Sequence, residues 1–251
     1  MRIRSLYLAI EGDDYLTPNP PGSDFPFSVS HIVSDFDFQT GSFLNYFDRV
    51  LKKSKFQSEE FQFVTIRGRK KPSNKYLIKK HFKSLEVEIP FDEKKYKELY
   101  PFKNKYPIKG LLSPILKEEE FNIFLFEMIM EGLLKSKKQE APIPYDFLIE
   151  TLSNFKLGGF NNEWIHKKKI CKDYGVIAYL KCRLTSNYFS LELIIEKSKK
   201  EIYKKEVLRT LPNVIMYKDE FKDIQVVEGK LLIMKNTSEE SILFSLDLSS
   251  L

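Results

Sequence analysis

The chain has 251 residues, 42% of them hydrophobic and 14% aromatic, and its formal net charge is +6. This composition can build a substantial core and excludes an intrinsically disordered protein.

The two cysteines, Cys171 and Cys182, are too few for a disulfide-dense secreted fold and fit no zinc-binding spacing. We expect two buried thiols on strands, or a bridge if those strands are paired neighbours. No long apolar run is present, which predicts no membrane span and a cytoplasmic location.

The first elements along the chain are two strands and a helix. Residues 3–10 predict a strand, and the proline-rich residues 13–25 an irregular loop. Alternating apolar residues at 27–33 predict a second strand. Ser42 is expected to cap a helix whose apolar face repeats at i, i+3, i+4, i+7 and i+8. That face consists of Phe43, Tyr46, Phe47, Val50 and Leu51.

Charge is concentrated in the next part of the chain. Residues 1–50 hold 3 Lys+Arg against 7 acids, whereas residues 51–110 hold 17 against 7. Strand patterns at 61–67 and 75–90 flank the turn-like residues 68–74 and predict a hairpin with a cationic tip. Within this basic hairpin, eight cations occur without an acid: Arg67, Arg69, Lys70, Lys71, Lys75, Lys79, Lys80 and Lys83.

Helices are expected to follow the basic segment. A short helix is predicted at 92–100, and a long one after Ser113-Pro114, with Glu118 to Glu120 near its start and lysines near its end. This second helix is apolar almost all round, which predicts that it is buried on several sides. Residues 136–144 are the best linker candidate. The predicted domains are therefore 1–140 and 141–251, although one continuous domain is also compatible.

The sequence pattern of the C-terminal half changes from helical to strand-like. A helix is expected from Pro144 to Gly158-Gly159, and from Trp164 onward short β-type runs recur every 8–12 residues. The predicted fold class is α+β: a mixed N-terminal half with a small sheet and a buried helix, then an antiparallel β-rich half, either a sandwich or an open barrel. The predicted strands are 177–184, 188–196, 202–208, 214–217, 224–227, 231–234 and 242–248.

No catalytic or cofactor motif stands out. Nucleophile elbows and phosphate-binding loops are absent from the sequence, and its histidines have no local partners that indicate catalysis. Asp223 with Glu228-Gly229-Lys230 is better explained as a hairpin turn than as a nuclease site. A metal-dependent hydrolase would need the N-terminal acids, which lie in or beside the proline-rich loop. Those acids are Asp13, Asp14, Asp35 and Asp37; the histidines are His31, His81 and His166.

A resemblance covers roughly the last ninety residues. The segments 160–164, 182–185, 188–191, 208–212 and 220–224 resemble the β-rich segments of bacterial immunity proteins of polymorphic toxin systems, with a lone tryptophan, Trp164, before a β meander. The resemblance implies a cytoplasmic protein that binds a cognate toxin domain and blocks it. Inhibitors of nuclease toxins tend to be acidic, so a nuclease target would require the acidic first 50 residues to make the contact.

These observations favour a non-enzymatic binding protein without a metal or cofactor. We expect its eight cations to meet the acidic face of a protein partner, such as a toxin domain, because a concentrated charge raises the association rate. The alternative is a nucleic-acid-binding or nucleic-acid-processing protein that uses the same basic hairpin. A third interpretation is purely structural: Tyr76, Ile78 and Phe82 pack inward, and the cations only remain solvated.

Overall fold

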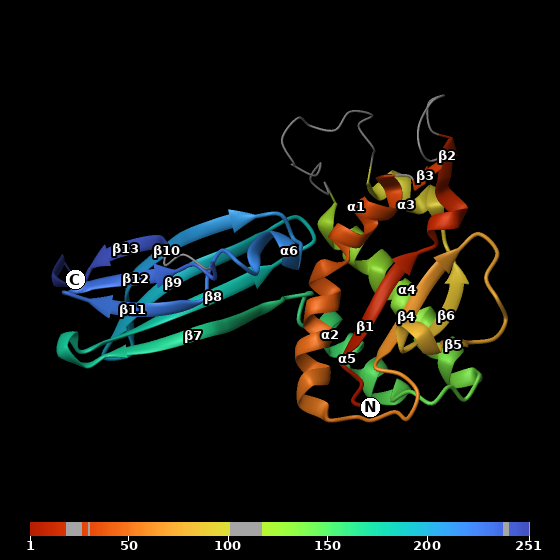
Figure 1. The fold of residues 1–251 in the computed structure, drawn as a ribbon, viewed down its shortest axis with the longest axis horizontal. Helices are drawn as coiled ribbons and strands as arrows, with labels where there is room; N and C mark the ends of the chain where they lie inside the picture. Colours follow the sequence, from red (N-terminus) through yellow and green to blue (C-terminus); the bar gives the residue numbers. More distant parts are fainter. Residues whose placement is uncertain (19–26, 30, 101–116, 238–240, 251) are drawn as a thin grey trace. The chain divides into compact units, whose positions relative to one another are not determined.

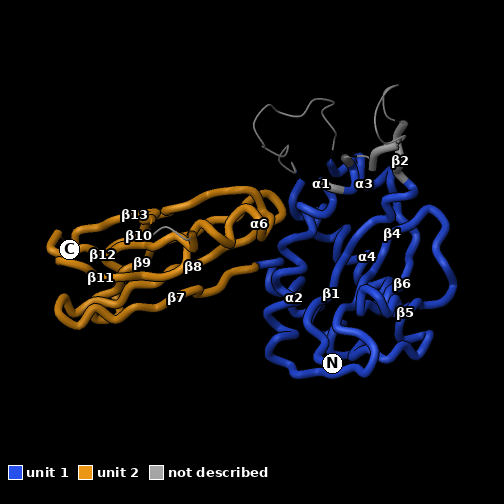
Figure 2. The backbone as a smooth tube through the Cα atoms, viewed as in Figure 1, with its two compact units in different colours: residues 1–161 blue, residues 162–251 orange. Residues whose placement is uncertain are grey.

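The computed structural model describes residues 1–18, 27–29, 31–100, 117–237 and 241–250, so the predicted cap at Ser113-Pro114 lies outside the described residues (Figure 1). It confirms the α+β class. Two compact units, residues 1–161 and 162–251, each have an apolar core (Figure 2). The units divide after Asn161, beyond the predicted boundary at 140, because the helix that follows residue 144 packs into the core of unit 1.

Unit 1 contains a four-stranded sheet in the order β1-β4-β6-β5. The strand β4 pairs in parallel with β1 and with β6, whereas β5 is an edge strand antiparallel to β6. The predicted basic hairpin is therefore wrong, because β6 lies between β4 and β5. The strands are β1 (Ser5–Ile10), β4 (Phe63–Arg69), β5 (Leu77–Lys79) and β6 (Ser84–Pro90), and β2 (Leu16–Pro18) pairs separately with β3 (Phe27–Val29).

The helices of unit 1 share a core with one face of this sheet. In α2 the predicted apolar face is confirmed, since Phe43, Phe47 and Leu51 are fully buried. The helix begins at Gly41 with Thr40 at its N-cap, so Ser42 is not the cap. The predicted strand at 27–33 is wrong from His31 onward, because α1 begins there. The helices are α1 (His31–Gln39), α2 (Gly41–Ser54), α3 (Glu93–Leu99), α4 (Glu118–Lys138) and α5 (Tyr145–Leu157), with 3-10 turns η1 (Gly12–Tyr15) and η2 (Lys80–Phe82).

A glycine allows α4 to approach the sheet closely. A Cβ atom on Gly132 would lie 2.6 Å from Cγ2 and 2.7 Å from Cγ1 of Ile66 in β4. We expect Gly132→Ala to lower the free energy of unfolding of unit 1 by about 1–2 kcal/mol, since overpacking outweighs the better helix propensity of alanine. Urea unfolding measures this, with Gly158→Ala as the control, because its Cβ would lie 3.4 Å from the nearest atom. An unchanged midpoint for Gly132→Ala would show that Ile66 moves aside.

Unit 2 consists of two antiparallel sheets, ordered β10-β9-β8-β7 and β11-β12-β13. Buried residues of β8, β9, β11 and β12 form one core between them, and neither sheet closes into a barrel. The predicted strand at 214–217 is wrong: it is the short helix α6, because the Asn213 side chain accepts a hydrogen bond from the Ile215 backbone N–H. The elements are β7 (Glu163–Cys171), β8 (Val176–Leu184), β9 (Phe189–Lys197), β10 (Lys200–Thr210), α6 (Val214–Tyr217), β11 (Asp223–Val227), β12 (Lys230–Met234) and β13 (Ile242–Asp247).

Both cysteines are free, buried and on strands, which confirms the first of the two expectations. In the β7–β8 pair, Cys171 lies opposite Val176 and Cys182 lies opposite Trp164. The two thiols are therefore at opposite ends of the pair, too far apart for a bridge. Burial raises the pKa of the Cys171 thiol, which keeps it protonated and unreactive.

Candidate functional site

The eight predicted site cations do not form one cluster. They belong to β4, the loop that follows it, β5 and η2, and they divide into two groups. The first group, the inner cations, pairs with carboxylates of unit 1 and consists of Arg67, Arg69, Lys70 and Lys79. The second group, the outer cations, is exposed, has no ion pair within the described residues, and consists of Lys71, Lys75, Lys80 and Lys83.

Glu86 holds two of the inner cations on the polar face of the sheet, the face opposite the helices. This carboxylate is only 2% exposed. Its Oε2 lies 2.9 Å from Nε of Arg67, and its Oε1 lies 2.9 Å from Nζ of Lys79. A negative charge on β6 is therefore placed between positive charges on β4 and β5.

Glu88 holds Arg69 in the same way. Its Oε1 accepts a hydrogen bond from Nη1 of Arg69 at 2.7 Å, and its Oε2 accepts one from the Ser73 backbone N–H at 2.6 Å. Glu11 lies 3.4 Å from Nη2 of Arg69. Burial alone would lower the pKa of Arg69, but the hydrogen bond and charge of Glu88 and the charges of Glu11 and Asp14 raise it, so the guanidinium stays charged.

Lys70 belongs to a separate contact with the N-terminal segment. Its ammonium group donates to the backbone oxygen of Asp14, its backbone N–H donates to the Asp14 carboxylate, and Glu93 lies 3.9 Å away. The sequence analysis did not identify the acids that hold the inner cations. The available signal was the spacing, because Glu86 and Glu88 alternate with apolar residues on β6 as Arg67 and Arg69 do on β4.

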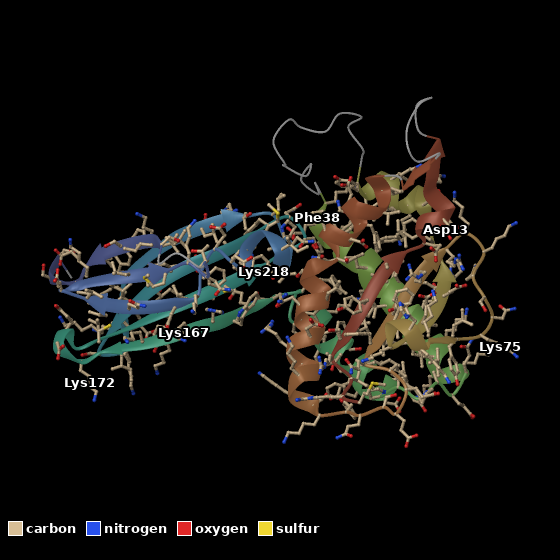
Figure 3. The ribbon with its side chains drawn as sticks, viewed as in Figure 1. Asp13, Phe38, Lys75, Lys167, Lys172 and Lys218 are labelled. Atoms are coloured by element: carbon tan, nitrogen blue, oxygen red, sulfur yellow. The ribbon has the colours of Figure 1, made fainter. Side chains whose placement is uncertain are left out.

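An exposed aromatic residue, Phe82, lies between two of the outer cations along the chain, Lys80 and Lys83. Phe82 is 66% exposed and Leu77 43% exposed, although large apolar side chains are usually buried. Lys75 lies on the outer edge of unit 1, in the loop before β5 (Figure 3). We give the name β5 patch to the exposed residues in the loop before β5, in β5 and in the segment that follows it, which are Lys71, Lys75, Leu77, Lys80, Phe82 and Lys83. The structural interpretation required Tyr76, Ile78 and Phe82 to pack inward. Tyr76 and Ile78 are half-buried against the core of unit 1, but Phe82 is not.

A recess of about 260 Å³ opens beside the β5 patch on the polar face of the sheet. It combines aromatic side chains with charged and hydroxyl groups. The aromatic rings of Tyr7 and Phe63 pack edge to face, with centroids 5.6 Å apart. The residues that line the recess are Tyr7, Phe63, Thr65, Arg67, Lys79, Phe82, Ser84 and Glu86.

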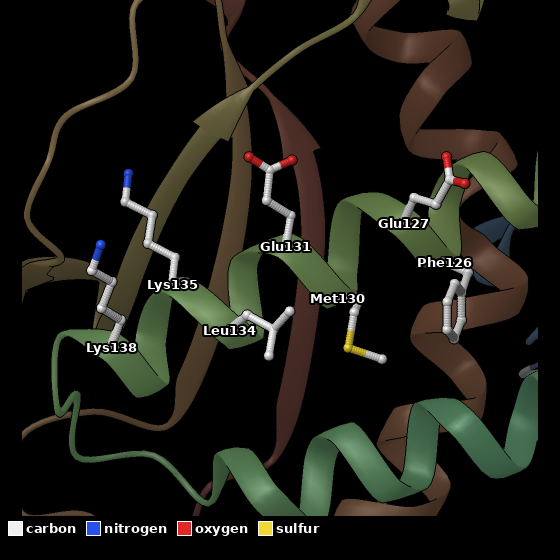
Figure 4. Close-up of a pocket in the computed structure, with 7 residues that line it drawn as sticks. All are labelled: Phe126, Glu127, Met130, Glu131, Leu134, Lys135 and Lys138. Carbon is white, nitrogen blue, oxygen red and sulfur yellow. The ribbon is translucent and has the colours of Figure 1, made fainter.

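A second hollow, of about 500 Å³, follows the surface of α4 (Figure 4). Phe126, Met130 and Leu134 repeat every four residues and extend to one side of the helix, while Glu127 and Glu131 extend to the other. Leu134 is 52% exposed. The hollow is a shallow apolar stripe and brings together no pair of groups suited to catalysis.

The N-terminal acids lie in different elements. Asp14 contacts Lys70 from η1, whereas Asp35 and Asp37 belong to α1, and Asp35 accepts a hydrogen bond from the Tyr100 hydroxyl at 3.5 Å. Burial by surrounding atoms raises the pKa of the Asp37 carboxyl to about 6, and the charge of Arg67 acts in the opposite direction. Within the described ranges, no three His, Cys, Asp or Glu side chains are grouped to hold a metal ion.

The remaining candidates have ordinary structural environments. His81 packs edge to face against Phe82, and His166 contacts Phe221 in unit 2. The predicted hairpin turn at Glu228-Gly229 is confirmed, since it joins β11 to β12. Asp223 lies 3.3 Å from Lys167 of β7.

Comparisons with protein-family models, with curated proteins and with solved structures returned no match. Among the helices of the described residues, none has both the length and the apolar character needed to cross a bilayer.

Proposed function

We propose that this chain is a non-enzymatic binding protein that uses the β5 patch to dock onto an acidic face of another protein, and blocks that protein by covering it. The observation that carries the proposal is Phe82, two-thirds exposed between Lys80 and Lys83. Burying such a ring in a partner contributes about 1.5–3 kcal/mol, and aromatic anchors of this kind dominate the affinity of many interfaces.

The lysines supply the second part of the proposal. The outer cations are not neutralised by carboxylates of the described residues, so their field reaches solvent and accelerates encounter with an acidic surface. The resemblance of the C-terminal segment to immunity proteins makes a toxin domain the partner class that we favour. Nucleic acid is less favoured than protein, because the inner cations are paired with carboxylates and only the outer cations remain as an unpaired positive surface for a phosphate backbone.

The test compares two triple variants in cross-linking and affinity capture from the native cell. The first carries Lys75→Glu, Lys80→Glu and Phe82→Ala in the β5 patch. The matched control carries Lys53→Glu, Leu157→Ala and Lys172→Glu, which are also exposed but lie outside the β5 patch. We expect an acidic protein that is captured by the wild type and the control to bind the first variant at least about 30-fold more weakly, as the loss of an aromatic anchor implies.

Two outcomes would overturn the proposal. One is equal capture of the same partner by both variants. The other is tight binding of a labelled single-stranded oligonucleotide that weakens steeply with salt and is lost in the first variant, which would establish the nucleic-acid alternative.

A further inference from the structure

The recess on the polar face is smaller than a typical small-molecule site. Its volume of about 260 Å³ lies below the roughly 300–1,000 Å³ of most ligand pockets. One side chain of a partner fits such a space better than a whole nucleotide or cofactor. Phe82 both lines the recess and belongs to the β5 patch, so a protein docked on the patch would also cover the recess.

Arg67 is held in place but has unused hydrogen-bonding capacity. Its Nε lies 2.9 Å from Glu86 and 3.6 Å from Glu11, which anchors the guanidinium as an ion pair. None of its five N–H groups makes a hydrogen bond of good geometry with a described residue, and Nε is buried. Arg69, two residues along β4, instead donates to Glu88. A guanidinium group that is held in place, and whose terminal N–H groups make no hydrogen bond, is suited to bidentate contact with an oxyanion.

The charges of the recess and its immediate surroundings balance. Arg67 and Lys79 contribute two positive charges to its lining and Glu86 one negative charge, while Glu11 adds a second negative charge 3.6 Å from Nε of Arg67. The hydroxyl groups of Thr65 and Ser84 are paired with each other at 2.9 Å. Two buried atoms of the lining, Nε of Arg67 and Oε1 of Glu86, make no hydrogen bond of good geometry with a described residue. Lys79 lies 2.9 Å from Oε1 of Glu86, so the groups that the lining offers to a ligand are the terminal N–H groups of Arg67.

We propose that the recess binds one carboxylate side chain of the partner protein, with its oxygens on Arg67 and its methylene groups against Tyr7, Phe63 and Phe82. This inference deepens the proposed function and depends on it. It makes Arg67 the specificity-determining residue for an acidic anchor, whereas the outer lysines act mainly on the rate of encounter.

The test uses benzoate, which carries a carboxylate on a flat apolar body, and follows backbone amide resonances by NMR. We expect saturable shifts at Thr65, Phe82 and Ser84 with a millimolar dissociation constant. Benzamide, the uncharged equivalent, should bind at least about tenfold more weakly, since a charge-assisted hydrogen bond contributes about 1.5–3 kcal/mol and 1.4 kcal/mol corresponds to tenfold.

Two arginine variants provide the matched comparison. Arg67→Lys keeps the positive charge beside Glu86 but removes the fork, and we expect it to weaken benzoate binding by about tenfold. Arg69→Lys lies on the same face of the same strand but outside the lining, and should leave benzoate binding unchanged. No saturable shift with the wild type, equal binding of benzamide, or equal effects of the two variants would overturn the inference. Tighter binding of inorganic phosphate than of benzoate would also overturn it, in favour of a phosphorylated ligand.

The same variants separate this inference from the proposed function. If partner capture survives Arg67→Lys but is lost with the β5-patch variant, the docking function stands and the carboxylate anchor is wrong. If benzoate binds as expected but partner capture survives the β5-patch variant, the proposed function is wrong, and with it the assignment of the ligand to a partner protein.

Discussion

Replacing Glu86 with glutamine is expected to lower the free energy of unfolding of unit 1 by about 2–3 kcal/mol. Removing one partner of a buried ion pair costs about 3–5 kcal/mol, and partial solvent access to the cations reduces this value. The carboxylate is 2% exposed, whereas the Arg67 and Lys79 side chains are 23% and 38% exposed. After the substitution, these two positive charges would face each other with no negative charge between them.

Chemical denaturation monitored by far-ultraviolet circular dichroism measures this effect. The matched control is Glu127→Gln in the same unit, because Glu127 pairs with Lys95 at 2.7 Å but is 55% exposed; we expect a loss below about 1 kcal/mol. Adding Lys79→Met to Glu86→Gln should recover part of the loss by removing the repulsion. If Glu86→Gln costs no more than Glu127→Gln, the charged groups on the polar face do not stabilise the sheet.

Phe189→Ala is expected to destabilise unit 2 by about 4 kcal/mol, the usual cost of removing a fully buried phenylalanine. The Phe189 ring is 0% exposed and stacks on Tyr217 of α6 with centroids 3.9 Å apart. It also stacks on Phe221, with centroids 5.6 Å apart. The substitution would leave a cavity and remove the support of α6 at the same time.

The single tryptophan makes this prediction specific to one unit. Trp164 lies 6.2 Å from Phe189, ring centroid to ring centroid, so its fluorescence follows unit 2. Circular dichroism at 222 nm follows mainly unit 1, which holds the long helices. We expect only the tryptophan transition to move, and expect Ile202→Ala, at a position 40% exposed, to move it little. A parallel shift of both transitions would mean that the two units unfold as one.

Helices with a clear apolar period could be predicted from the sequence, and the pairing of strands could not. The repeat of Phe43, Phe47 and Leu51 predicted the buried face of α2 correctly because burial of such a stripe dominates helix packing. The turn-like residues 68–74 indicated a break in the chain, which the structure places after Arg69, because Gly68 and Arg69 still belong to β4. Such residues do not specify which strands pair. Pairing was decided by the parallel match of β4 with β6, which buries apolar residues of both strands on the helical side.

Two elements of unit 2 show how local signals are overridden. Residues 214–217 are rich in β-branched and apolar side chains, which favour a strand, but Pro212 and the Asn213 cap start a helix there. In β7 the alternation is interrupted by a register shift between Ile165 and Lys167, so the period-2 pattern is lost in the sequence. Of the candidate site, the outer lysines were identified, but the exposure of Phe82 could not be inferred from the sequence. The alternation of Glu86 on β6 was a signal for the carboxylate that holds Arg67, but it could be interpreted only with the parallel pairing of β4 and β6.

The order of the strands in space differs from their order along the chain, and this has a consequence for assembly. The edge strand β5 precedes β6 in sequence but pairs with it alone among the described strands. As the chain emerges during synthesis, β5 therefore has no template until the following strand has been added to β4. The residues of the β5 patch therefore take their places on the sheet only once β6 is present, and a chain that ends before β6 cannot form this patch.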